Sequence, residues 1–217
     1  MSPAKPRPAG VRRPAQGRTA PKKPAGELAP ALALRLRVTL LNVEPPVWRE
    51  VLVPVDLTFA QLHKVLQAAM GWEDDHMHEF EVGEDRIGPP APQDFFAGDE
   101  PPRDERKTRL GEILDGHRKF RYWYDFGDDW WHAIEIRKSA PDEGSGPRLL
   151  AGEGACPPED CGGPYGYADL LQALADPKHP EHRELREWAG DFDPRRFDFD
   201  RAAKAVAKAI RRATVHK

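Results

Sequence analysis

The first regular pattern in the chain is an alternation of apolar and polar residues between positions 31 and 42. Apolar side chains occupy the even positions from Leu32 to Leu40, and arginines and a threonine lie between them. A period of two places the two sets on opposite faces of a strand, so the segment predicts a half-buried strand. Two prolines after Glu44 interrupt it, and a second strand is expected at 47–53.

The pattern then changes to the helical period. Thr58 and Gln61 have the spacing of a capping box, and apolar residues follow at intervals of three and four up to Ala69. Gly71 suits the position after a helix C-terminus, where a left-handed backbone is common. The order strand, strand, helix is similar to the start of a β-grasp-like unit.

Three more strands and several helices are expected downstream. The strands are 76–82, 119–125 and 130–137, the last two joined as a hairpin. A proline-rich, charged stretch from Gly88 to Arg106 predicts a surface excursion, and a short helix follows near Leu110. Later helices are expected at 168–175, 180–189 and 200–213. The sequence therefore predicts an α+β fold: a mixed, mostly antiparallel sheet with a β-β-α start, flanked by helices, with a helical C-terminus.

Charge divides the chain into two parts. Residues 1–30 contain seven lysines and arginines and one acidic residue, a net charge of +6. The whole chain has −3, so residues 31–217 carry −9 (−3 minus +6). The proline- and alanine-rich segment 1–30 has almost no large apolar side chains, which predicts a disordered basic tail before a single domain at 31–217. The tail could contact nucleic acid weakly, or simply keep the protein in solution.

No apolar stretch approaches the roughly 18–20 residues that span a bilayer, and no secretory leader is evident. These features predict a cytoplasmic protein without a membrane partner. In such a compartment the paired cysteines Cys156 and Cys161 suggest a thiol or metal role more than a disulfide.

Histidines and cysteines offer a candidate metal site. His76 and His78 are two residues apart on an expected strand, so both imidazoles project from one face. His132 lies on another strand, and Cys156 and Cys161 lie in a glycine- and proline-rich loop. Zinc accepts nitrogen and sulfur ligands of this kind, so the five residues are predicted to converge on a zinc ion.

Further side chains are candidates for the same pocket, because they are carboxylates or aromatic residues beside the expected ligands: Asp125, Asp128, Trp130, Glu159, Asp160 and Tyr165. Other interpretations stay open. The histidines could be hydrogen-bonded core residues, the aspartates could bond their own turn amides, or the pocket could be polar without a metal. Cys161 could be an activated thiolate, and an exposed aromatic hairpin would favour peptide or single-stranded nucleic-acid binding.

Four stretches resemble the plasmid pRiA4b ORF-3-like family: LRVTLLNVEPPVWREVLVP, LHKVLQAAMGW with the following HMHEF, YDFGDDWWH, and CPPEDCGGPYGY. The resemblance implies an α+β fold and no established activity. Some relatives are passengers of mobile elements with a resolvase-like label, but no recombinase chemistry is evident in this sequence. The predicted function is a small intracellular binding or accessory module associated with a plasmid or mobile element, optionally with a structural metal. The alternative is a metal-dependent hydrolase or nuclease.

Overall fold

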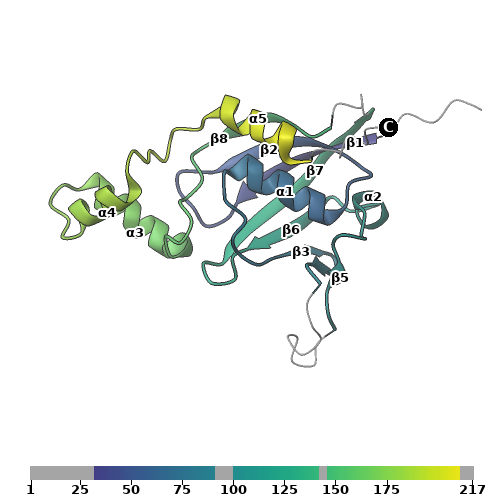
Figure 1. The fold of residues 1–217 in the computed structure, drawn as a ribbon, viewed down its shortest axis with the longest axis horizontal. Helices are drawn as coiled ribbons and strands as arrows, with labels where there is room; N and C mark the ends of the chain where they lie inside the picture. The colour runs from purple at the N-terminus through teal and green to yellow at the C-terminus, as the bar shows by residue number, and fades with distance from the viewer. Residues whose placement is uncertain (1–31, 91–99, 142–145, 211–217) are drawn as a thin grey trace, which may run out of the picture.

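A computed structural model describes residues 32–90, 100–141 and 146–210. The tail predicted at 1–30 lies outside these residues. Eight strands form one sheet in the order β5-β4-β3-β6-β7-β1-β2-β8 (Figure 1). The strands are β1 (Leu32–Leu40), β2 (Trp48–Pro54), β3 (His78–Val82), β4 (Asp85–Gly88), β5 (Arg103–Asp104), β6 (Lys119–Tyr124), β7 (Trp130–Pro141) and β8 (Arg148–Glu153).

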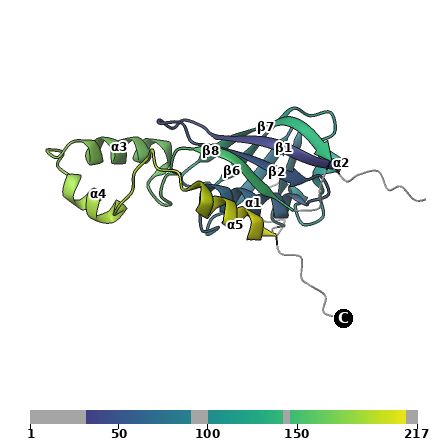
Figure 2. The ribbon, with the colours of Figure 1, turned by 90° about the horizontal axis from the view of Figure 1, so that it is seen from above.

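All neighbouring strands are antiparallel except β4 and β5, which are parallel. The helices are α1 (Phe59–Met70), α2 (Leu110–Ile113), α3 (Gly163–Ala175), α4 (His182–Ala189) and α5 (Phe199–Ala209). Helices α1 and α5 lie against the same face of the sheet, whereas α3 and α4 project beyond its end (Figure 2). The predicted α+β fold, with its β-β-α start and helical end, is therefore confirmed.

The predicted capping box begins α1. The Gln61 amide donates to Thr58 Oγ1, and the Thr58 amide donates to Gln61 Oε1 at 3.0 Å. Gly71 ends the helix in the left-handed conformation, with φ at 94°. Both ends of the helix are thus determined by local sequence.

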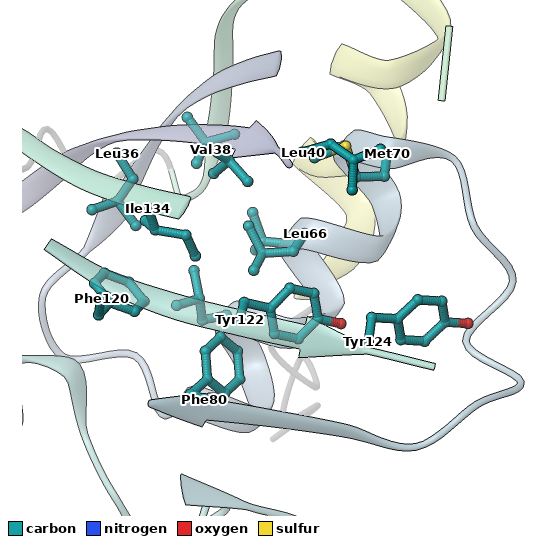
Figure 3. Packing of buried hydrophobic residues seen from close by; sticks show 14 of the residues in the cluster. Leu36, Val38, Leu40, Leu66, Met70, Phe80, Phe120, Tyr122, Tyr124 and Ile134 are labelled. Carbon is teal, nitrogen blue, oxygen red and sulfur yellow. The ribbon is translucent and has the colours of Figure 1, made fainter. Parts of the chain in front are cut away.

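The main core lies between α1 and the inner face of the sheet. Leu66 of α1 faces Val38 of β1 and Ile134 of β7, and the rings of Phe120 and Tyr122 extend the same layer along β6 (Figure 3). The strand register continues this layer toward the histidines, because Tyr122 lies opposite His132 and Tyr124 lies opposite His78. Core packing therefore determines where these side chains lie.

Some boundaries differ from those expected. Strand β3 begins at His78, so His76 belongs to the preceding loop and not to the strand. Short strands β4 and β5 lie within or beside the predicted surface excursion, and β8 adds an edge strand. Helix α3 begins at Gly163, because Pro164 fits the first turn of a helix although it is typical of loops elsewhere.

Across the described segments, every helix is too short or too polar to cross a membrane.

Candidate functional site

Three loops meet at one end of the sheet. They are the loop after α1 (71–77), the turn between β6 and β7 (125–129), and the loop from β8 to α3 (154–162), which contains both cysteines. Side chains and backbone groups of each loop contact the other two, as described below. The candidate site is assembled from these three segments.

His76 lies between two carboxylates at the centre of the three loops. Its Nδ1 is 3.6 Å from Asp125 Oδ2, and its Nε2 is 3.4 Å from Asp160 Oδ1. The imidazole is 26% exposed, so it faces solvent as well as the two acids. Ligand atoms of His76, Asp125 and Asp160 lie within 4.8 Å of one another, which is close enough for a shared cation.

Asp125 serves the turn and the site at once. Its Oδ1 accepts hydrogen bonds from the amides of Gly127 at 3.0 Å and Asp128 at 3.3 Å. This is the turn geometry expected for aspartate, and it leaves Oδ2 directed toward His76. The turn therefore holds a carboxylate in a fixed position beside the imidazole.

Asp128 attaches the cysteine loop to the same turn. Its Oδ2 accepts a hydrogen bond from the Gly162 amide at 3.1 Å. At Gly163, where φ is +69°, a Cβ would lie 2.2 Å from the Asp128 carbonyl oxygen. Only glycine allows the loop to approach the turn this closely.

Glu159 connects the cysteine loop to the other two segments. The Tyr124 hydroxyl donates to Glu159 Oε1 at 2.6 Å, and the Glu73 amide donates to Oε2 at 3.1 Å. Burial, with Glu159 as the next cause, raises the pKa of Tyr124 and keeps its hydroxyl protonated as a donor. The Trp72 indole also donates to the Pro157 carbonyl at 3.0 Å, so the loop is held along much of its length.

A pocket of about 460 Å³ opens beside His76. Four acidic side chains line it: Glu73, Asp75, Glu159 and Asp160. Ligand atoms of the first three also lie within 4.8 Å of one another. No lysine or arginine is among the described residues that line this pocket, so its charge is strongly negative.

The cysteines contribute little reactive character. Cys156 lines the same pocket as His76, and burial raises the pKa of its thiol well above the usual range. Burial, followed by the charge of Asp128, raises the pKa of Cys161 to about 12. Both thiols are therefore protonated at neutral pH, which does not favour an activated thiolate.

The five predicted ligands do not form one group. Among the described residues, three sets bring three ligand atoms within 4.8 Å, and none of them contains a cysteine or His132. His78 belongs to a different set from His76, because it points into the core from β3 whereas His76 lies in the loop.

His132 lies in the core. Its Nδ1 is 3.2 Å from the Tyr122 carbonyl oxygen, and its ring meets the Trp72 ring edge-on at 5.4 Å between centroids. Burial lowers its pKa to about 4, so it is neutral in the folded protein. Trp130 is also buried, whereas Tyr165 is 89% exposed, so neither faces His76 as a pocket residue would.

A family profile matches residues 32–201, which include every residue of this site. The chain belongs to the plasmid pRiA4b ORF-3-like family. It is 46% identical over 180 residues to the uncharacterized protein y4hQ of Sinorhizobium fredii, with 81% of this chain and 91% of the relative covered. Its fold is similar to the crystal structure of MM3350 from Methanosarcina mazei Go1, described as a protein of unknown function. The TM-score is 0.70 at 37% identity, over 79% of this chain and 98% of that one.

The family resemblance and the site geometry point to the same residues. His76, Asp125 and Asp160 each come from a different one of the stretches that resemble the family: HMHEF, YDFGDDWWH and CPPEDCGGPYGY. These stretches are far apart in the sequence, and the fold brings one polar side chain from each to a common point.

Several functional candidates were missed from the sequence. His63 and Asp74 form a buried group with His78, and Glu105 bonds the same histidine. One signal was present, since His63 is four residues after Phe59 and thus falls on the apolar face of α1. Glu105 follows a two-residue strand, and no local pattern indicated that it would be buried.

Proposed function

We propose that this family member is a metal-dependent accessory module of the cytoplasm, carried by a plasmid or mobile element. A divalent transition-metal ion, with zinc as the first choice, would bind at His76, Asp125 and Asp160. The observation that carries the proposal is the group of three ligand atoms within 4.8 Å, supplied by two separate loops and a tight turn. An ion there would join these segments more firmly than hydrogen bonds alone.

The spacing of the ligands supports an ion over a purely hydrogen-bonded cluster. Both separations between His76 nitrogens and carboxylate oxygens, 3.4 and 3.6 Å, exceed the usual 2.7–3.2 Å range of a hydrogen bond. Zinc binds nitrogen and oxygen at about 2.0–2.2 Å, so two of its ligands lie roughly 3–4 Å apart. Whichever ring nitrogen binds the ion, the other keeps a carboxylate partner, as metal-ligating histidines usually do.

The charge of the pocket supports a cation as well. Two unit charges 4 Å apart repel by about 1 kcal/mol in water and more where solvent is partly excluded. Four carboxylates line the pocket beside His76, and Asp125 adds a fifth nearby. A bound divalent ion would offset this repulsion.

Zinc affinity tests the proposal. We expect His76→Ala to weaken zinc binding at least about 100-fold in calorimetric titration, because loss of even an outer-shell partner costs about 10–100-fold. The matched control is His179→Ala, which removes a half-buried histidine from another loop and should change affinity less than about twofold. Unchanged zinc affinity in His76→Ala would contradict the proposal.

A metal-dependent hydrolase or nuclease is the second candidate. Three protein ligands leave a coordination position open, which is the arrangement of catalytic zinc, and the pocket gives solvent access to it. Hydrolysis of bis(p-nitrophenyl) phosphate by the zinc- or manganese-loaded protein, lost in His76→Ala, would favour this candidate. Metal binding without turnover would favour the accessory role.

A further inference from the structure

A second group of metal-ligating side chains lies in the interior, between α1, β3 and the segment after β5. His63 comes from α1 and His78 from β3, while Asp74 lies in the loop after α1. Ligand atoms of these three residues lie within 4.8 Å of one another. Glu105 adds a carboxylate oxygen 2.7 Å from His78 Nε2.

The two imidazoles lie face to face. Their ring centroids are 3.5 Å apart and their planes differ by 4°. Asp74 Oδ1 lies 2.5 Å from His63 Nε2, so each Nε2 atom faces a carboxylate oxygen. Two nitrogens and two oxygens are thus gathered at the edge of one stack.

This group is expensive to bury as it stands. Both histidines and Glu105 are almost inaccessible to solvent, and a buried carboxylate requires compensation. The ion-pair partners of Asp74 and Glu105 are these two histidines. Burial, and then the neighbouring His78, lowers the pKa of His63 to about 4, so this imidazole is neutral at neutral pH and does not balance Asp74.

The surroundings also resemble a metal centre. The Tyr122 hydroxyl lies 2.8 Å from Nδ1 of His63, and the Gln67 amide donates to that hydroxyl at 2.9 Å. A partner on the second ring nitrogen fixes the orientation of the ring and leaves Nε2 toward Asp74 and His78. The Asp74 side chain is 44% exposed, which provides a route from solvent to the buried nitrogens.

We propose that His63, His78, Asp74 and Glu105 form a second site for a divalent transition-metal ion, separate from the site at His76. Two imidazoles and two carboxylates are ligands that Zn²⁺, Mn²⁺, Fe²⁺ and Co²⁺ accept, and the two acids neutralise a divalent charge. Parallel rings do not direct both Nε2 lone pairs at one point, so binding requires the two rings to separate and tilt. Metal binding therefore replaces the stack with a coordination shell.

The test is the number of zinc ions bound by the full-length protein, measured by competition with a chromophoric chelator. We expect two ions in the wild type and one in the double variant Asp74→Asn/Glu105→Gln, whose substitutions keep the side-chain shapes. The control Asp104→Asn removes the neighbouring carboxylate, which pairs with Arg106 and Lys107, and should retain two ions. Two ions retained by the double variant would overturn the proposal.

The outcomes separate this site from the one at His76. One ion that survives His76→Ala and disappears in the double variant would support the buried site and refute the proposed function. One ion lost only in His76→Ala would do the reverse. If the double variant fails to fold, histidine-selective ¹⁵N NMR of the wild type decides: zinc should shift the Nε2 resonances of His63 and His78, and unshifted resonances would overturn the proposal.

Discussion

Replacing Arg49 by methionine should lower the free energy of unfolding by about 3–5 kcal/mol, the range for removing a charge from a buried polar network. Arg49 is 1% exposed, and its guanidinium donates to four carbonyl oxygens, those of Trp48, Ala69, Glu153 and Gly154. Methionine fills a similar volume but leaves these four acceptors without their donor, and each unsatisfied buried acceptor costs about 1–3 kcal/mol.

The position of Arg49 explains why the effect should reach the site. Its partners are the C-terminal turn of α1, its own strand β2 and the end of β8, from which the cysteine loop begins. The guanidinium also lies 3.7 Å from the centre of the Phe197 ring, just before α5. Burial lowers the pKa of Arg49 to about 10, so the group remains charged at neutral pH.

Urea denaturation measures this effect. The control is Arg35→Met, because Arg35 is a largely exposed arginine whose partner is Glu50, and exposed ion pairs contribute about 0–1 kcal/mol. A change below about 1 kcal/mol in Arg49→Met would show that the four carbonyls find other donors.

Gly163→Ala should lower the stability by about 3 kcal/mol, as a severe overlap in a packed segment does, and weaken zinc binding at the His76 site at least about tenfold. The added Cβ would lie 2.2 Å from the Asp128 carbonyl oxygen, so the cysteine loop has to move away from the turn. Asp160 belongs to this loop and Asp125 to the turn, so the movement separates two of the proposed ligands.

The control for this variant is Gly116→Ala. Gly116 also has a positive φ, +79°, but a Cβ there has no neighbour within 4 Å. It should cost only the roughly 1–2 kcal/mol of left-handed backbone for an L-residue and leave zinc affinity unchanged. Equal effects of the two substitutions on zinc affinity would mean that contact with the turn does not position the site.

Elements with a strong local pattern were predictable. The alternation in β1 and the capping box of α1 required only neighbouring residues, and both were confirmed. Strands β4 and β5 were not, because four and two residues are too few to show a period. Their pairing depends on β3, which is a tertiary effect.

The candidate site was predicted in part. His76, Asp125 and Asp160 were all among the expected residues, but sequence spacing placed His76 and His78 on one strand face. Because β3 begins at His78, the two imidazoles belong to different groups. The cysteines were expected as ligands, yet burial in the loop keeps their thiols protonated without a metal, and no described group of three ligands contains them.

Anomalous diffraction from crystals grown with zinc tests the central claim most directly. Data collected above and below the zinc absorption edge should show a peak about 2.0–2.2 Å from a ring nitrogen of His76 and from oxygens of Asp125 and Asp160. Crystals of His76→Ala should lack this peak. A fully zinc-soaked wild-type crystal without a peak between these three residues would contradict the proposed metal site.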